Sequence, residues 1–146
     1  IQDADLEYDP ADYASLLSVY SGGEGKVIFG SRFTKRPISS YIDIYFLANY
    51  FFTGMVNLLC GSNLTDMWTC YKLLPRDLFL SLNIQSTNFN IEPEITIKCL
   101  KRGIKITEVP ISYKPRTVKD GKKIGWLDGF KALVDIIKFK FFDLEK

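Results

Sequence analysis

The sequence of 146 residues contains no histidine, few cysteines and no large excess of charge of either sign. The absence of histidine excludes Ser–His and Cys–His nucleophile systems, histidine-ligated zinc and an imidazole proton switch. A metal ion in this protein must therefore be held by oxygen or sulfur atoms. Nineteen basic and seventeen acidic residues give a net charge of +2, which is too balanced for a general nucleic-acid-binding protein. We therefore expect no nucleic-acid partner, and any basic site must be local.

The three cysteines, Cys60, Cys70 and Cys99, are widely spaced and form no C-x-x-C pair. Because three cysteines cannot all pair within one chain, we expect buried thiols in a reducing compartment. The hydrophobic fraction of 47% and the charged fraction of 25% are typical of an ordinary folded domain and exclude a disordered chain. The chain begins Ile1-Gln2-Asp3 without an initiator methionine, which we interpret as the start of a fragment whose earlier part is missing.

The spacing of apolar residues predicts alternating helices and strands. Asp9 and Pro10 indicate a helix start, because aspartate caps helix N-termini and proline suits the first helical position. We expect helices over residues 10–20, 44–60 and 92–102 and from residue 126 onward, and strands over residues 26–32 and 104–109, with an extended piece through residue 113. The order strand, helix, strand at the start of the chain predicts an α/β layer.

The segment 44–60 is uncharged and rich in aromatic residues, and its seventeen residues lie near the lower limit for a membrane-spanning helix. However, Asn49, Thr53 and Asn57 recur every four residues and form one polar seam along a helix. A membrane span has no need of that seam. The pattern therefore favours a buried or interfacial helix that faces a polar cleft.

The segment from Trp126 is predicted to form an amphipathic helix. Its apolar side consists of Leu127, Phe130, Leu133, Ile137, Phe141 and Leu144, and is broadened by Ile136, Phe139 and Phe142. Both this helix and the aromatic helix before it are natural places for a lipid tail or a membrane surface to bind. Packing into the core or against a second copy of the chain explains each of them equally well.

Two acidic residues, Asp3 and Asp5, lie at the end of an apparent strand and directly before a helix. Ligands bind at such strand ends in open α/β sheets. Paired carboxylates there suit Mg²⁺ or Mn²⁺, which take oxygen ligands and also bind diphosphate oxygens, and Glu7 is close enough to add a third oxygen. The alternative is that these acids are cap and helix-dipole partners.

Three further features suggest chemistry. Arg32 ends a predicted strand, where its guanidinium fork can bind phosphate, although a surface arginine is an equal alternative. Asp66 follows the polar-seamed helix and has a turn or cap residue as its alternative role. The segment 114–123 holds five basic residues and one acid, which suits either a solvated loop or a lid that neutralises phosphates.

Several ordered blocks of the sequence resemble the family 2 glycosyltransferases of the GT-A fold, in particular the branch of dolichyl-phosphate mannose synthase-like, polyprenyl-phosphate sugar transferases. The blocks are QDADLEYDP at residues 2–10, GSRF at 30–33, LTDMWTCYK at 64–72, FNIEPEI at 89–95, EVPISYKPR at 108–116 and GKKIGWLDG at 121–129. The resemblance implies an α/β fold with a mixed sheet and flanking helices. Residues 1–146 would form the C-terminal, acceptor-side part of that domain, and the N-terminal half that binds the nucleotide would be absent.

The resemblance also implies an activity and a set of site residues. The family transfers a sugar from a nucleotide-sugar, here a GDP- or UDP-sugar, to a polyprenyl phosphate with inversion at the anomeric carbon, at the cytoplasmic face of the membrane. Asp3, Asp5 and Glu7 would hold Mg²⁺ or Mn²⁺ on the donor diphosphate, and Arg32, Arg116, Lys122 and Lys123 would bind donor or acceptor phosphate. Asp66 matches the position discussed as catalytic, and Glu94 is a second candidate base if the acceptor is a hydroxyl group.

Three interpretations therefore compete. The first, which we favour for the parent protein, is a polyprenyl-phosphate glycosyltransferase that acts peripherally at or tethered to the cytoplasmic membrane. The second is a soluble sugar transferase with a hydroxyl acceptor, which needs a general base because a hydroxyl is not ionised at pH 7. The third is a non-catalytic module that binds a partner or forms a homo-oligomer. With the first interpretation favoured for the parent protein, we expect the isolated fragment to be inactive.

Overall fold

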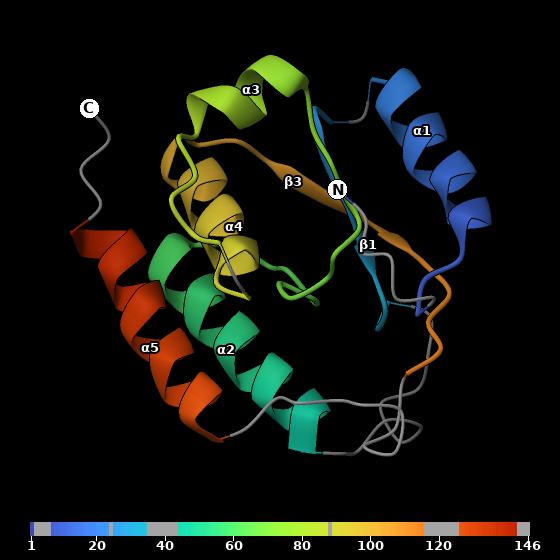
Figure 1. Ribbon diagram of the computed structural model, residues 1–146. Coiled ribbons are helices and arrows are strands. Elements are labelled where there is room, and N and C mark those ends of the chain that lie inside the picture. Colours follow the sequence, from blue (N-terminus) through green and yellow to red (C-terminus); the bar gives the residue numbers. More distant parts are fainter. Residues whose placement is uncertain (2–6, 24, 35–43, 88, 116–125, 143–146) are drawn as a thin grey trace.

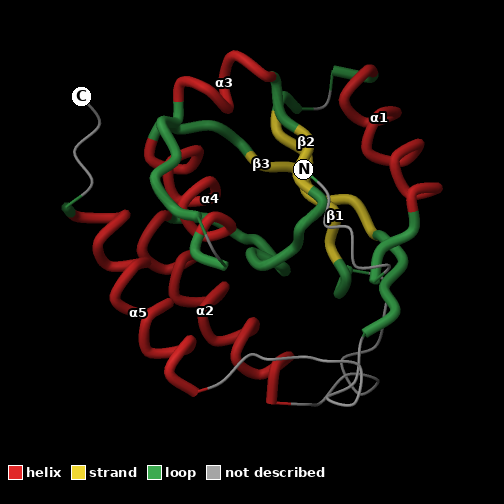
Figure 2. Tube along the Cα trace, viewed as in Figure 1, coloured by secondary structure: helices red, strands yellow, loops and turns green. Residues whose placement is uncertain are grey.

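The computed structural model describes residues 1, 7–23, 25–34, 44–87, 89–115 and 126–142 (Figure 1). Its centre is a three-stranded sheet in the order β2-β1-β3, formed by Lys72–Leu73, Val27–Ser31 and Ile106–Pro110. Strand β1 pairs antiparallel with β2 and parallel with β3, so the sheet is mixed (Figure 2). The predicted α/β class with a mixed sheet and flanking helices is confirmed.

Helices lie on both faces of this sheet. They are the 3-10 turn η1 (Pro10–Asp12), α1 (Tyr13–Ser21), α2 (Ile44–Cys60), α3 (Arg76–Ser81), α4 (Ile91–Lys101) and α5 (Trp126–Phe141). Helix α1 lies on one side of the sheet, α4 lies on the other, and α2 and α5 form a further layer against α4 (Figure 1). The fold is therefore a helix–sheet–helix sandwich with an additional helical layer.

Local sequence signals explain where the predicted helices begin and end. The Asp9 side chain accepts a hydrogen bond from the Ala11 backbone N–H at 2.9 Å, which confirms it as the cap of the first helical segment. Gly103, with φ of 69°, follows α4 in the left-handed conformation that glycine adopts at helix ends. Helix α2 spans the predicted residues. Strand β3 begins two residues later than expected.

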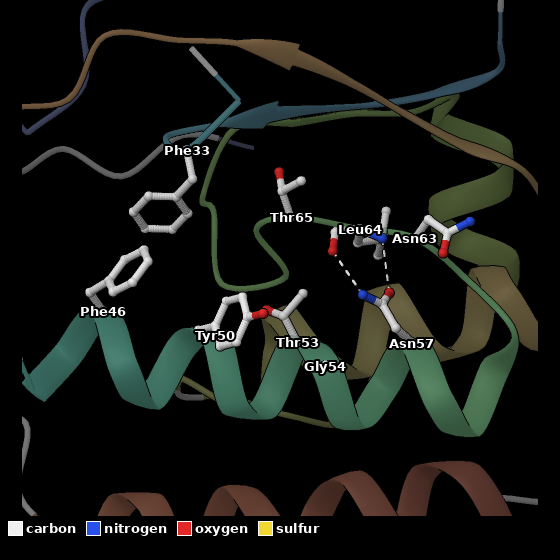
Figure 3. A pocket seen from close by; sticks show the side chains of 9 residues that line it. All are labelled: Phe33, Phe46, Tyr50, Thr53, Gly54, Asn57, Asn63, Leu64 and Thr65. Atoms are coloured by element: carbon white, nitrogen blue, oxygen red, sulfur yellow. Dashed lines mark hydrogen bonds between the residues drawn. The ribbon is translucent and has the colours of Figure 1, made fainter. Parts of the chain in front are cut away.

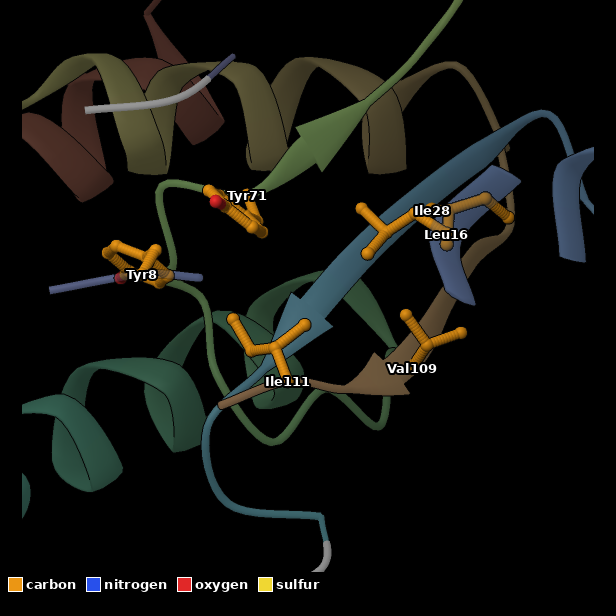
Figure 4. Packing of buried hydrophobic residues seen from close by; sticks show 6 residues of the cluster. All are labelled: Tyr8, Leu16, Ile28, Tyr71, Val109 and Ile111. Atoms are coloured by element: carbon orange, nitrogen blue, oxygen red, sulfur yellow. The ribbon is translucent and has the colours of Figure 1, made fainter. Parts of the chain in front are cut away.

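The all-buried strand β1 forms the core with alternate side chains on its two faces. Ile28 packs with Leu16 of α1 and with Tyr8, Tyr71, Val109 and Ile111 (Figure 4). Val27 and Phe29 point to the opposite face, where they pack against Ile95 and Cys99 of α4. A third cluster joins Val56 of α2, Ile97 of α4 and Ile136 of α5, and so fixes the outer helical layer.

The predicted apolar side of α5 is divided between the core and the surface. Ile136 and Phe139, which were predicted to broaden that side, are buried together with Ala132. Phe130, Ile137 and Phe141 of the same predicted side are exposed. Because α5 is apolar around most of its circumference, spacing alone does not determine which stripe meets α4 and α2. Leu144 and the side chain of Leu127 lie outside the described part of the chain.

Gly30 is required by close packing at the centre of β1. A β-carbon at this position would lie 2.7 Å from Ile111 Cγ2 and 3.0 Å from Tyr71 Cβ. We expect Gly30→Ala to lower the free energy of unfolding by about 1–3 kcal/mol, the usual cost of overpacking a core. Chemical denaturation of the full-length protein measures this change.

Gly54→Ala is the matched control for that substitution. Gly54 lies within α2, and a β-carbon there would meet nothing within 4 Å. Because alanine favours helix over glycine, this change should stabilise the protein by about 0.5–1 kcal/mol. Equal effects of the two substitutions would contradict the packing argument.

Candidate active site

The site is built around a buried ion pair between Arg32, which directly follows β1, and Asp66, which lies in the loop after α2. Arg32 Nε donates to Asp66 Oδ2 at 2.7 Å, and Arg32 Nη2 donates to Asp66 Oδ1 at 2.7 Å. The Arg32 backbone N–H adds a third bond to Oδ2 at 3.1 Å. The paired side chains are 13% and 0% exposed, so this bidentate pair is held away from solvent.

The polar seam of α2 completes the surroundings of Asp66. Asn49 Nδ2 donates to Asp66 Oδ1 at 2.8 Å, and Thr53 Oγ1 donates to Asn49 Oδ1 at 2.9 Å. One turn further on, Asn57 accepts the Leu64 N–H and donates to the Leu64 carbonyl. The seam therefore binds the loop that carries Asp66, a role that its four-residue spacing alone did not reveal.

These contacts saturate the Asp66 carboxylate, because each oxygen accepts two hydrogen bonds. Burial raises the pKa of Asp66, but the charge and hydrogen bonds of Arg32 and the Asn49 amide outweigh burial and hold this pKa below its usual value. Asp66 is thus an ionised group whose lone pairs all point at fixed donors. Accepting a proton would require part of this network to break.

Arg32 is held on its other sides by aromatic rings. Its guanidinium carbon lies 4.9 Å from the centre of the Tyr113 ring and 5.3 Å from that of Phe33. Burial lowers the pKa of Arg32, but Asp66 more than compensates and leaves this pKa well above its ordinary value. The Arg32 side chain also forms a hydrogen bond with the Tyr113 side chain. Because a guanidinium has five N–H donors, the bonds to Asp66 and Tyr113 account for only part of its capacity to bind an anion.

An open cleft of about 390 Å³ lies beside this pair (Figure 3). Phe46, Tyr50 and Gly54 of α2 line one wall, and Phe33 and Thr65, the sequence neighbours of Arg32 and Asp66, line the other. The cleft therefore has an aromatic end, formed by Phe33, Phe46 and Tyr50, and a polar end with Asn57 and Asn63 (Figure 3). Its described lining includes neither Arg32 nor Asp66, which adjoin it through their neighbours Phe33 and Thr65. The aromatic end suits the apolar part of a ligand.

Two residues that sequence reasoning did not single out also support the site. Glu108 of β3 accepts hydrogen bonds from the backbone N–H groups of both Thr65 and Asp66. Lys72 of β2 is 1% exposed, pairs with Glu92, and donates to the carbonyl groups of Met67 and Thr69. The signal for Lys72 is a single charge within the apolar segment 67–74, because a lone buried cation requires a partner.

The structure places Glu94 in a separate network. This fully buried carboxylate accepts from Lys98 Nζ at 2.6 Å and from the backbone N–H groups of Gln85 and Ser86 at 2.9 and 2.8 Å. Burial raises the pKa of Glu94, but these hydrogen bonds leave the pKa below its usual value. Among the described interactions none links Glu94 to Arg32 or Asp66, and its role as a base stays a prediction.

The remaining predicted site residues lie at the margin of the described structure or beyond it. Glu7 is half-buried, and its backbone carbonyl accepts from the Lys114 N–H at 2.9 Å, which brings residue 7 next to residue 114. Asp3, Asp5, Arg116, Lys122 and Lys123 are outside the described residues, so their roles stay predictions. Within the described ranges, no group of three or more acidic or cysteine side chains is placed to hold a metal ion.

None of the helices in the part of the chain that the structure covers is both long and apolar enough to cross a membrane.

Three proteins similar to this chain carry the names of sugar transferases. The chain is 31% identical to glycosyltransferase AglJ of Haloferax volcanii over 114 residues, which cover 78% of this chain and 37% of that protein. It is 24% identical to a low-salt glycan biosynthesis hexosyltransferase of the same organism, covering 78% of this chain and 28% of the relative. It is 26% identical to the undecaprenyl-phosphate mannosyltransferase of Micrococcus luteus, covering 56% and 35% respectively.

The chain thus spans about a third of the length of these curated relatives. No family model and no solved structure matches it. The three relatives support a glycosyltransferase family, and the small mixed sheet flanked by helices is consistent with part of a GT-A domain.

Proposed function

We propose that the full-length protein transfers a sugar from a nucleotide-sugar, of the GDP or UDP type, to a polyprenyl phosphate with inversion at the anomeric carbon. The observation that carries this proposal is the Arg32–Asp66 pair, whose sequence neighbours Phe33 and Thr65 line an aromatic-rich cleft. Arg32 would bind the acceptor phosphate with the N–H groups that Asp66 leaves, and the cleft wall would contact the first part of the lipid chain.

The state of the two predicted catalytic carboxylates favours a phosphate acceptor over a hydroxyl acceptor. A hydroxyl acceptor needs a general base, whereas a phosphate already carries its negative charge at pH 7. Both oxygens of Asp66 and of Glu94 are engaged by fixed donors. We therefore assign Asp66 the task of positioning Arg32, and the hydroxyl-acceptor enzyme becomes the second candidate.

The charge balance of the site supports a divalent ion and the basic segment 114–123 as further components. The described part of the site contains one cation, Arg32, beside the carboxylates of Asp66 and Glu108. This arrangement alone gives little net attraction for phosphate. Asp3, Asp5 and Glu7 are the residues that would hold Mg²⁺ or Mn²⁺, whose charge would stabilise the leaving diphosphate. Arg116, Lys122 and Lys123 would supply the remaining positive charge.

The outer surfaces of α2 and α5 support action at a membrane face. Leu47, Tyr50, Phe51 and Leu58 of α2 and Phe130, Val134, Ile137 and Phe141 of α5 are large apolar residues that are all exposed. Lys131 and Lys138 of α5 are exposed beside them. Exposed aromatic and aliphatic side chains with flanking lysines suit the interface of an anionic membrane.

A transfer assay tests the proposed function. The full-length protein should move label from GDP- or UDP-sugars into an organic-extractable polyprenyl-phosphate product, and chelation of divalent cations should stop this transfer. Asp5→Ala should abolish metal-dependent transfer, and Lys105→Gln, a change of an exposed residue, should leave the rate unchanged. If the Asp5→Ala variant turns over as fast as the wild type, Asp5 does not hold a catalytic metal ion. If no label enters a lipid product, the proposed polyprenyl-phosphate acceptor is wrong.

A further inference from the structure

Glu108 forms a clamp on the loop that carries Asp66. Its Oε1 accepts the backbone N–H groups of Thr65 and Asp66, each at 3.0 Å. Its Oε2 accepts the Thr65 N–H at 2.8 Å and the Thr65 hydroxyl at 2.9 Å. Two successive backbone N–H groups and one hydroxyl therefore converge on a single carboxylate. The arrangement fits an ionised carboxylate, because every group that meets it is a donor.

The same carboxylate fixes the direction of a chain of hydroxyl groups that leads back to β1. Because the Thr65 hydroxyl donates to Glu108, it must accept in its contact with Ser31 Oγ at 2.6 Å. Ser31 Oγ in turn accepts from the Phe33 backbone N–H at 3.1 Å. The hydrogen-bond chain thus runs from Phe33 through Ser31 and Thr65 to Glu108.

The contacts of Glu108 with the loop and the chain of hydroxyl groups reach different partners of the ion pair. The clamp holds the backbone N–H of Asp66, and the hydroxyl chain holds the residues directly before and after Arg32. The strand register places Glu108 opposite Phe29 of the parallel strand β1, so Glu108 lies on the neighbour of the central strand that directly precedes Arg32. One side chain on β3 is therefore connected to both partners of the pair.

We propose that Glu108 is a positioning residue for sugar transfer, which sets the relative placement of Arg32 and Asp66 through the Thr65-Asp66 backbone and the Thr65–Ser31 hydroxyl chain. The expected effect of Glu108 on sugar transfer rests on the proposed function. The placement of Arg32 and Asp66 by Glu108 does not depend on that function. Glu108 does not itself line the cleft and touches no reacting group; of the cleft lining it contacts Thr65. It acts through the ion pair.

The charges around Glu108 indicate how the clamp responds to acid. The charged groups that face it across the loop are Asp66 and, beyond it, Arg32. Burial raises the pKa of Glu108, and the charge of Asp66 acts in the same direction, whereas the hydrogen bonds of Thr65 and Asp66 oppose this shift. Since the pKa of Asp66 is lowered, Glu108 takes up a proton at higher pH than Asp66 does. Acidification therefore releases the clamp before it breaks the ion pair.

The test uses the amide resonance of Asp66 and the Nε–H resonance of Arg32 in the full-length protein. Glu108→Gln replaces one acceptor oxygen by an NH₂ group and removes the charge. We expect both resonances to shift and their hydrogen exchange to accelerate by about tenfold or more. The rate of sugar transfer should fall by about tenfold to a hundredfold, because a small misplacement of a binding group has effects of this order.

Thr65→Val and Thr65→Ser provide a matched pair. Valine keeps the shape but breaks the hydroxyl chain, whereas serine keeps the hydroxyl group. We expect the valine variant to shift the Arg32 resonance and the serine variant to retain it. If Glu108→Gln does not fold, this pair decides the question, and equal behaviour of the two Thr65 variants overturns the proposal.

The outcomes separate this proposal from the proposed function. Unchanged resonances in Glu108→Gln overturn the clamp, whatever the activity. Shifted resonances with an unchanged transfer rate overturn its role in the reaction. If the wild-type protein transfers no sugar, the proposed function fails, whereas the resonances of Asp66 and Arg32 still decide whether Glu108 positions the pair.

Discussion

Replacing Asp66 with asparagine in the full-length protein is expected to lower the rate of sugar transfer by about a hundredfold or more. Asparagine keeps the shape of the side chain but removes its charge and replaces one oxygen by an NH₂ group, which cannot accept from Arg32. Arg32 Nε and Nη2 each donate to a different Asp66 oxygen at 2.7 Å, so one of these bonds is lost and the guanidinium is no longer held. Steady-state kinetics at saturating donor measure the effect.

Asn49→Ala is the control for Asp66→Asn. It removes one hydrogen bond from Asp66 Oδ1 and leaves the ion pair in place, so its effect on transfer should be much smaller. Thermal unfolding of each variant should accompany the kinetics, because loss of one partner of a buried pair also destabilises the fold. A folded Asp66→Asn protein with wild-type turnover would contradict the assigned role of the pair.

The pH dependence of transfer distinguishes positioning from general-base catalysis by Asp66. Because the folded pKa of this carboxyl is below its usual value, the ion pair is complete above the ordinary pKa of about 3.9 and is lost only as the pH falls through the lower folded value. If the acceptor is a phosphate, the plot of transfer rate against pH should show no titration step above the usual aspartate range that disappears in Asp66→Asn. A titration step of that kind would favour a hydroxyl acceptor and a general base at Asp66.

Lys72→Met is expected to lower the free energy of unfolding by about 3–5 kcal/mol, the usual cost of removing one partner from a buried pair. Lys72 is 1% exposed. Its ammonium group donates to the Glu92 carboxylate and to the Met67 and Thr69 carbonyls. The same group lies 4.5 Å from the centre of the Phe29 ring. Methionine fills similar space but leaves Glu92 as an unpaired buried charge. Denaturant unfolding of the full-length protein measures the loss.

Two further variants make this prediction specific to the pair. Lys72→Met combined with Glu92→Leu removes both charges and should recover part of the stability, because apolar replacement of a whole buried pair is often close to neutral. Lys105→Met changes an exposed lysine and should stay within about 0.5 kcal/mol of the wild type. A Lys72→Met protein as stable as the Lys105 variant would show that the pair does not contribute to the fold.

The sequence predicted those elements that carry their own boundary signals. Helix α2 was expected over its observed residues, and α4 was expected to within one residue at each end, because Gly103 stops it locally. Helix α3 and strand β2 have six and two residues, which is too short for a periodic pattern to identify them. The buried face of α5 depends on how it packs against α2 and α4, which is tertiary information.

The candidate site was predictable as separate residues but not as an assembly. Arg32 and Asp66 were each identified from their positions at the end of a strand and after a helix, with a surface residue and a turn residue as the alternatives. Their pairing joins residues 34 positions apart in the chain, and no local pattern encodes it. The same holds for Glu108, whose place in an alternating strand gave no reason to expect that it binds the Asp66 loop.

The measurement that tests this account most directly compares two lipid acceptors. The full-length protein is supplied with a labelled nucleotide-sugar and with either a polyprenyl phosphate or the matching polyprenol in the same vesicles, as wild type and as Arg32→Gln. We predict transfer to the phosphate alone, and in the variant a raised KM for polyprenyl phosphate with little change in the KM for the nucleotide-sugar. Equal transfer to both acceptors, or an unchanged KM for the phosphate in Arg32→Gln, would contradict phosphate recognition by the Asp66-held arginine.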